Sequence, residues 1–147
     1  MKIRGNTANI EIKNNLVYKI ISDKHKKYKK ELIEREVYWL KKLSHLDFIP
    51  KLIKYDENTI VMSYCGEPVS NKNKPKDYYI QLNTIKTKIY ENYCFYNDWK
   101  DGNLLVKDGK LFLIDFGWCS LIREDYTCDK NVDSTLKCKV SGNRFLL

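Results

Sequence analysis

Apolar positions along the chain occur first in short strand-like runs and then with helical spacing. Residues 9–12 (NIEI) and 16–21 (LVYKII) are two such runs, and the two residues between them, Asn14 and Asn15, predict a tight turn. Helical spacing follows over residues 25–44. This part of the chain is therefore predicted to form a strand hairpin followed by one long helix.

The middle of the chain continues with strands and then a second helix. The segments FIPKLIKY and TIVMSYC are strand-like, and the polar stretch GEPVSNKNKPKD at 66–77 is the most linker-like part of the sequence. A helix is expected after it, with Asp77 as its N-cap. The apolar stripe of this helix consists of Tyr78, Leu82, Ile85, Ile89 and Tyr93.

A second hairpin is expected near residue 108. The strand-like runs NLLV and LFLI flank residues 107–110 (KDGK), and Asp-Gly is a strong signal for a two-residue hairpin turn. The order of strands, helix, strands, helix and hairpin predicts an α+β protein with two lobes. We place the N-lobe at 1–64, a hinge or linker at 65–77 and a C-lobe at 78–147.

Length and composition are compatible with this prediction. The chain has 147 residues, the size of one domain, and its 43% hydrophobic content favours a globular fold over disorder. No apolar run approaches the ~20 residues of a membrane helix, and the first residues lack the apolar stretch of a signal peptide. Five cysteines without a Cys-x-x-Cys pair are expected to be reduced thiols. We therefore expect an intracellular protein without a membrane partner.

The net charge of +8 favours an anionic partner, such as nucleotide phosphates, nucleic acid or an acidic protein. The densest basic cluster is KHKKYKK at 24–30. We interpret it as a solvated helix face, because no aromatic platform with a recognisable RNA-binding pattern accompanies it. Nucleic acid is therefore a weakly supported partner.

One carboxylate stands where the first helix should present an apolar side chain. At about 100° per residue, Glu36 falls in the middle of the arc that contains Val37 and Leu40. A buried carboxylate is costly unless a cation meets it. Lys19, inside the apolar run LVYKI, is an equally unexpected charge. An ion pair between Lys19 and Glu36 would explain both; the alternative is a rotated helix with Glu36 at its edge.

Five segments resemble motifs of protein kinases. YNDWKDGNLLV resembles the catalytic loop, in which Asn follows His-Arg-Asp, and IDFG resembles the metal-binding Asp-Phe-Gly motif. VYKI resembles the strand that carries the kinase lysine, EVYWLKKLSHLDFIPKL the helix with its partner glutamate, and IVMSYC the strand that enters the hinge. These segments follow the kinase order over residues 5–117. The resemblance implies a two-lobed kinase-like fold with a small antiparallel-sheet N-lobe, one long helix and a heavily truncated helical C-lobe.

The resemblance also implies a site for ATP and Mg²⁺, with Mn²⁺ as an alternative ion. Asp98 would accept the proton of the attacking hydroxyl, and Lys100 would lie near the γ-phosphate. Asn103 and Asp115 would bind the metal ion. The implied nucleotide-binding residues are Gly5, Lys19, Glu36, Met62, Tyr64 and Cys65, with Met62 at the gatekeeper position.

Several positions depart from the kinase pattern. GNTANI keeps Gly5 alone of the usual three glycines. Tyr96 replaces the usual histidine and is expected to pack on the Asp-Phe-Gly turn. Asn97 replaces the arginine that binds activation-loop phosphate, so we infer no regulation by that route.

The C-terminal lobe is expected to be largely absent, because no Ala-Pro-Glu motif follows Gly117. The segment CDKNVDSTL at 128–136 resembles part of the small kinase in the KEOPS tRNA-modification complex. In that comparison Asp133 would match an aspartate that anchors the catalytic loop. The missing helices would leave apolar surface exposed, so a homodimer is expected.

The motifs leave several functions open. We favour an active minimal kinase with a protein Ser/Thr acceptor, which Lys100 supports. A pseudokinase, acting as a nucleotide-binding or regulatory module, is favoured by the reduced glycine loop. Gly102 and Asn103 also fit the DxxxGN pattern of small-molecule phosphotransferases related to aminoglycoside and choline kinases. A basic RNA-associated factor is the last alternative. The chain resembles miniature kinases expected in large DNA viruses, which implies host cytoplasm or the virion.

Overall fold

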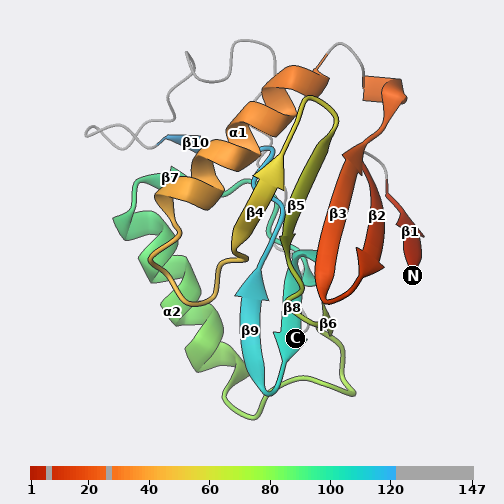
Figure 1. Cartoon of the computed structure of the whole chain (residues 1–147). Helices are drawn as coiled ribbons and strands as arrows, with labels where there is room; N and C mark the ends of the chain where they lie inside the picture. The colour runs from red at the N-terminus through yellow and green to blue at the C-terminus, as the bar shows by residue number, and fades with distance from the viewer. Residues whose placement is uncertain (6–7, 26–27, 122–147) are drawn as a thin grey trace.

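The computed structural model describes residues 1–5, 8–25 and 28–121, in which a sheet and a long helix precede a smaller C-terminal part (Figure 1). The segment 128–136, with Asp133, therefore lies outside the described residues. No helix in the described ranges combines the length and the apolar character needed to cross a membrane.

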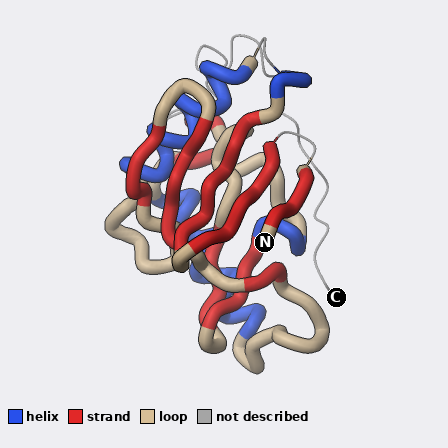
Figure 2. The backbone as a smooth tube through the Cα atoms, turned by 45° about the vertical axis from the view of Figure 1, so that its right-hand side comes forward, coloured by secondary structure: helices blue, strands red, loops and turns tan. Residues whose placement is uncertain are grey.

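An antiparallel sheet of five strands forms the N-terminal part (Figure 2). In spatial order its strands are β1 (Lys2–Arg4), β2 (Ala8–Lys13), β3 (Leu16–Ile21), β5 (Thr59–Ser63) and β4 (Leu52–Tyr55). Asn14 and Asn15 connect β2 to β3 with φ angles of 51° and 62°, a left-handed conformation that asparagine tolerates. The predicted tight turn is confirmed, and Lys19 lies in the central strand opposite Ile10 and Ile60.

The helix α1 (Lys29–Lys42) packs beside this sheet and follows a short 3₁₀ turn, η1 (Asp23–His25). The predicted apolar arc is buried, including Val37 and Leu40. Arg35 and Trp39 lie outside that arc but are also buried, with exposed fractions of 7% and 0%. The end of the Asp-Phe-Gly motif lies on this side, where Arg35 Nη1 donates to the Gly117 carbonyl at 3.4 Å. The helix is therefore buried on more sides than its sequence predicted.

As far as residue 121, the C-terminal part combines one helix with two small sheets. Its elements are β6 (Glu67–Pro68), α2 (Tyr78–Glu91), β7 (Cys94–Phe95), η2 (Asp101–Asn103), β8 (Leu104–Lys107), β9 (Lys110–Leu113) and β10 (Ser120–Leu121). β8 and β9 form the predicted hairpin, and its turn residues Asp108 and Gly109 both have positive φ, 51° and 74°. The two-residue turn is confirmed.

The predicted stripe of α2 is buried at four of its five positions, Tyr78, Leu82, Ile85 and Ile89. The prediction is wrong for Tyr93, which is 57% exposed and lies beyond the helix end with a φ of 58°. A left-handed residue after a helix redirects the chain, so helical spacing no longer applies there. Asp77 occupies the N-cap position without a capping bond, and its Oδ1 accepts from Gln81 Nε2 at 2.8 Å instead.

The stretch at 66–77, expected to be a linker, is attached to the hairpin. Glu67 and Pro68 form β6, which pairs with β8. Farther on, the Ser70 amide donates to Asn73 Oδ1 at 2.7 Å. The boundaries at 64/65 and 77/78 stay predictions.

Both parts share one hydrophobic core, which contains residues of the sheet, both helices and the C-terminal hairpin. A backbone bond of 3.0 Å from the Leu113 amide to the Phe48 carbonyl also joins the two parts. The predicted two-lobed α+β fold is confirmed, with α2 as the helix of the described C-terminal lobe.

Replacing Gly66 by Ala is expected to lower the free energy of unfolding by about 2 kcal/mol or more. Gly66 has a φ of 101°, and a Cβ atom there would overlap the Val106 carbonyl oxygen where β6 approaches β8. Gly102→Ala is the matched control, because nothing lies within 4 Å of a Cβ at that position. Urea unfolding of both variants measures the difference, and equal stabilities would contradict the prediction.

Candidate active site

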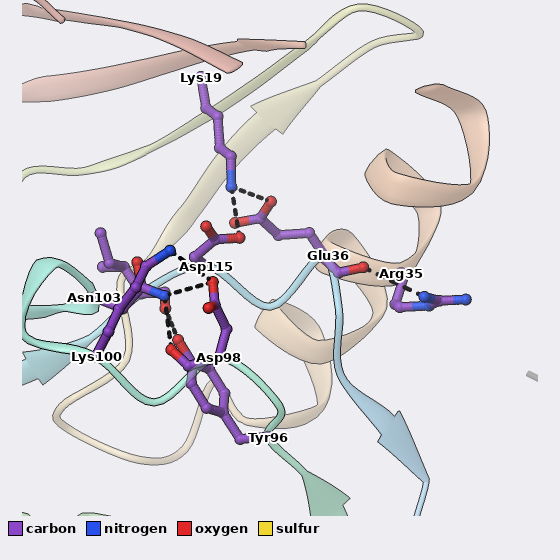
Figure 3. Close-up of polar contacts among 10 residues, drawn as sticks. Lys19, Arg35, Glu36, Tyr96, Asp98, Lys100, Asn103 and Asp115 are labelled. Carbon is purple, nitrogen blue, oxygen red and sulfur yellow. Dashed lines mark hydrogen bonds and ion pairs between the residues drawn. The ribbon is translucent and has the colours of Figure 1, made fainter. Parts of the chain in front are cut away.

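Lys19, Glu36 and Asp115 form an ionic cluster in which Lys19 and Glu36 are buried and Asp115 is half-buried (Figure 3). Lys19 Nζ lies 2.8 Å from Glu36 Oε2 and 3.1 Å from Asp115 Oδ1. The three side chains come from β3, from α1 and from the segment after β9. The predicted ion pair is confirmed and the rotated-helix alternative is wrong, because Glu36 is only 2% exposed.

The pKa values of the three groups follow from their burial and from the sharing of one ammonium by two carboxylates. Burial by itself lowers the pKa of Lys19, but the charges of Asp115 and Glu36 outweigh it and raise that pKa above its ordinary value. Burial also opposes ionisation of Asp115, yet the Lys19 charge holds the Asp115 pKa below its ordinary value. The pKa of Glu36 is raised because burial outweighs the attraction of Lys19. One ammonium thus faces two carboxylates, so its charge does not balance theirs and a further cation can bind there.

Asp115 has an unusual backbone conformation that its neighbours maintain. Its φ is 69°, in the left-handed region. The Tyr96 hydroxyl donates to the Ile114 carbonyl on one side. On the other side, the Tyr96 ring meets the buried Phe116 ring edge-on, with centroids 5.5 Å apart. The expected packing of Tyr96 on the Asp-Phe-Gly turn is confirmed. Burial raises the pKa of Tyr96, so its hydroxyl stays a donor.

Asp98 and Asn103 are held together in the loop before β8. Asn103 Nδ2 donates to both Asp98 Oδ2 and the Asp98 carbonyl, each at 2.9 Å. Lys100 Nζ lies 3.1 Å from the same Asp98 Oδ2. The Asn103 carbonyl accepts from the Ile114 amide at 3.0 Å, which joins this loop to the segment that carries Asp115. The turn η2 therefore places Asp98 and Asn103 beside the ionic cluster.

The sequence did not predict the contacts of Asn97. It showed only that this residue replaces the arginine of the kinase pattern. Asn97 is 4% exposed, and its Nδ2 donates to the Trp118 carbonyl at 2.9 Å and to Ser120 Oγ at 3.3 Å. It thereby fixes the segment after the Asp-Phe-Gly motif against the catalytic-loop segment. An asparagine flanked by aromatic and acidic residues gives no sequence signal for such a contact.

A cavity of about 600 Å³ lies between the sheet and the C-terminal hairpin. All the residues predicted for the site line it, although their roles stay predictions: Gly5, Lys19, Glu36, Met62, Tyr64, Cys65, Asp98, Lys100, Asn103 and Asp115. Apolar side chains line it as well, among them Ala8, Val17 and Leu105. Its charged groups thus share one cavity with an apolar surface that suits a flat ring.

Residues 62–68 line one side of the cavity, where hydrogen bonds hold the backbone and the side chain of Tyr64 in place. The Tyr64 amide donates to the Asn15 carbonyl at 3.2 Å, and its hydroxyl donates to Glu67 Oε1 at 2.6 Å. That bond raises the pKa of Tyr64 to about 12, so the hydroxyl stays protonated at neutral pH. Cys65 is buried, and burial raises the pKa of its thiol.

The donor atoms of this cavity fit a magnesium–nucleotide complex. Mg²⁺ prefers oxygen ligands and is commonly bound by one or two carboxylates together with phosphate oxygens. Asp115 supplies a carboxylate, and Asn103, whose Nδ2 is engaged by Asp98, can offer its amide oxygen as a ligand. The volume also lies within the range of roughly 300–1,000 Å³ typical of small-molecule sites.

Comparisons with known proteins agree with this fold. The family model of the RIO domain matches residues 7–123. Serine/threonine-protein kinase 1 of African swine fever virus (isolate Pig/Kenya/KEN-50/1950) is 30% identical over an alignment of 132 residues. The match covers 79% of this chain and 42% of the viral protein. The Rio2 kinase of Chaetomium thermophilum, in a complex with ADP, Mg²⁺ and phosphoaspartate, has a TM-score of 0.70 at 19% identity.

The chain is shorter than both of these proteins. The structural match covers 94% of this chain and 52% of the Rio2 chain, and the chain spans 42% of the viral relative. The likeness to the Rio2 structure therefore shows the fold, which is that of an atypical, protein-kinase-like domain.

Proposed function

The chain belongs to the RIO domain family, and from this premise we propose that it is a kinase that transfers the γ-phosphate of ATP to a hydroxyl acceptor. Ser and Thr side chains of proteins are the favoured acceptors. The observation that carries this proposal is the convergence of Lys19, Asp98, Asn103 and Asp115 on one cavity of about 600 Å³.

Lys19 binds the α- and β-phosphates of the nucleotide in this proposal. Its ammonium stays charged because two carboxylates raise its pKa, and Glu36 holds it in place at 2.8 Å. Asp115 now contacts the same ammonium at 3.1 Å. A phosphate that binds Lys19 would take over part of this contact, which would leave the Asp115 carboxylate able to hold the metal ion.

Asp115 and Asn103 bind Mg²⁺, with Mn²⁺ as an alternative ion, and the bound ion neutralises charge on the phosphates. Two features of the chain prepare these ligands. The left-handed backbone of Asp115 fixes the carboxylate, together with the hydrogen bond of Tyr96 to Ile114 and its ring contact with Phe116. The two bonds from Asn103 Nδ2 to Asp98 fix the amide.

Asp98 accepts the proton of the acceptor hydroxyl. As that oxygen forms its bond to the γ-phosphorus, the bond from phosphorus to the bridging oxygen breaks and ADP leaves. Lys100, with its Nζ 3.1 Å from Asp98 Oδ2, is close enough to balance charge on the transferred phosphate. Catalysis by this site is therefore positioning together with charge neutralisation.

The purine ring occupies the apolar end of the cavity, next to Met62, Tyr64 and Cys65. Gly5 covers the nucleotide from the side of β1. The Gly5 amide donates to the Ala8 carbonyl at 2.8 Å, and a Cβ on Gly5 would come within 2.7 Å of that oxygen. The one glycine kept from the usual three therefore stands where a larger residue would meet the backbone of Ala8.

The names of the relatives support the nucleotide and the acceptor class. The viral relative is named a serine/threonine-protein kinase, and the Rio2 kinase structure contains ADP and Mg²⁺. That structure also contains phosphoaspartate, which makes a carboxylate of the protein itself a second candidate acceptor. A homodimer and an intracellular location stay predictions from the sequence.

The test is to incubate the protein with γ-labelled ATP and Mg²⁺, alone and with a basic protein substrate. Mg·ATP is expected to raise the melting temperature, since ligand at about 100 times its Kd stabilises by about 2.7 kcal/mol. Label is expected on Ser or Thr of the substrate, and EDTA is expected to abolish the transfer.

Each other outcome selects a different function. Hydroxylamine-labile label on the chain itself would identify the carboxylate acceptor. Label on an aminoglycoside or choline, but not on protein, would identify a small-molecule phosphotransferase. Nucleotide binding without transfer to any of these acceptors would identify a pseudokinase, and absence of nucleotide binding would overturn the proposal.

A further inference from the structure

A second groove, of about 780 Å³, lies on the outside of the N-terminal lobe between α1 and β4. It is lined by Leu40, Lys41 and Ser44 on the helix side and by residues 51–55 on the strand side. None of these residues lines the nucleotide cavity. The groove is therefore separate from the proposed phosphate-transfer site.

The strand that borders this groove is an edge strand. Among the described residues, β4 pairs with β5 alone and ends the five-stranded sheet on the side opposite β1 (Figure 1). An edge strand directs every second backbone N–H and C=O away from its sheet, where another chain can pair with it. Ile53 and Tyr55 on this strand are 52% and 49% exposed. β4 thus offers both backbone hydrogen bonds and apolar side chains.

The groove is also positively charged. Lys41, Lys51 and Lys54 line it, and in the described part of the chain none of them forms an ion pair with a carboxylate. Lys41 instead reaches across the groove, where its Nζ lies 3.3 Å from the Tyr55 hydroxyl oxygen and 5.0 Å from the ring centroid. None of the described residues that line the groove is acidic.

The carboxylate next along the chain compensates these lysines only in part, because backbone amides of its own turn engage it first and Lys54 attracts it without forming an ion pair. Asp56 Oδ1 accepts from the amides of Asn58 and Thr59, each at 2.8 Å, and so caps the turn between β4 and β5. These amide bonds lower the pKa of Asp56, which keeps it charged but engaged in the turn. The lysines of the groove are therefore available to an external anion.

We propose that this groove binds an extended, acidic peptide segment of a partner protein. The segment adds as a strand to the outer edge of β4, and its backbone pairs there. Its acidic side chains meet Lys51 and Lys54, and its apolar side chains contact the exposed Ile53 and Tyr55. A peptide fits better than a nucleic acid, because phosphates would use the lysines but neither the strand edge nor the apolar surface.

Fluorescence anisotropy with a labelled octapeptide of alternating Val and Glu tests this proposal. The control peptide has Pro at every second position, which removes the N–H groups that pair with a strand. The alternating peptide is expected to bind saturably. The proline peptide is expected to bind at least about tenfold more weakly, because it forms fewer hydrogen bonds with the strand edge. Absence of saturable binding, or equal binding of both peptides, overturns the proposal.

Two charge-reversal variants locate the site. Lys51→Glu combined with Lys54→Glu is expected to weaken binding by about tenfold or more, because like charges then face the peptide. Lys13→Glu combined with Lys72→Glu makes the same charge change at exposed positions that do not line the groove, and is expected to leave the affinity within about twofold. Equal losses would show non-specific attraction and overturn the proposal.

A short oligouridine serves as the nucleic-acid competitor. It is expected to leave the peptide bound at physiological salt. Displacement of the peptide by oligouridine, lost again in the Lys51→Glu and Lys54→Glu variant, would assign the groove to nucleic acid instead. These measurements need no nucleotide, so their outcome is independent of whether the protein transfers phosphate.

Discussion

Asp98→Asn is expected to lower the rate of phosphate transfer by about 10²–10⁴-fold, the contribution typical of a positioned general base. Asparagine keeps the size of the side chain and an oxygen that accepts from Asn103 Nδ2, which now donates to Asp98 Oδ2 at 2.9 Å. It cannot take up the proton of the acceptor hydroxyl. The loss should therefore appear in the single-turnover rate, whereas the stabilisation of the protein by Mg·ATP should stay close to that of the wild type.

Asp108→Asn is the control for this variant. It makes the same chemical change in the same part of the chain, at a turn residue with a φ of 51° that asparagine also adopts readily. It is expected to transfer phosphate at the wild-type rate. If Asp98→Asn kept the wild-type rate, Asp98 would not be the proton acceptor. If it also lost stabilisation by Mg·ATP, its main role would be to orient Asn103.

Lys19→Met is expected to lower the free energy of unfolding by about 3–5 kcal/mol and to abolish transfer. The substitution removes the ammonium that lies 2.8 Å from Glu36 and 3.1 Å from Asp115, and leaves both carboxylates without their cation. Because Glu36 is 2% exposed, water cannot replace the lost partner without structural change. Urea unfolding measures the stability, and the labelled-ATP assay measures the transfer.

Lys110→Met is the control for lost ion pairs in general. Lys110 Nζ lies 2.7 Å from Asp47 Oδ2, closer than Lys19 lies to Glu36, but both side chains are exposed. Exposed pairs contribute at most about 1 kcal/mol, so this variant should be nearly as stable as the wild type. If both variants lost the same free energy of unfolding, burial of the ion pairs would not explain the loss in Lys19→Met.

A double substitution separates the stability effect from the functional one. Lys19→Met combined with Glu36→Leu removes one of the two uncompensated carboxylates and fills its place with an apolar side chain. Replacement of a buried pair by apolar residues is often neutral or stabilising. The double variant should therefore recover much of the stability lost in Lys19→Met, yet stay inactive because no group binds the phosphates. A double variant no more stable than the single one would contradict this account.

The local patterns of the sequence determined the turns, the helices and the composition of the candidate site. The turns at Asn14 and Asp108 depend on the φ angles that single residues tolerate, so neighbours suffice to predict them. The ion pair of Lys19 and Glu36 was predictable because each charge violates an apolar pattern that a partner restores. The motif order then implied which other side chains line the cavity.

Contacts between distant segments decided what the local patterns could not. Arg35 has the position of a solvent-facing helix residue, yet the chain at Gly117, 82 residues later, covers it. Asn97 was notable in the sequence only as a substituted position, yet it fixes the segment at Trp118. The groove beside β4 exists because no described strand follows β4 in the sheet. In each case the environment of a residue depends on which remote segment packs against it, and local spacing carries no information about that choice.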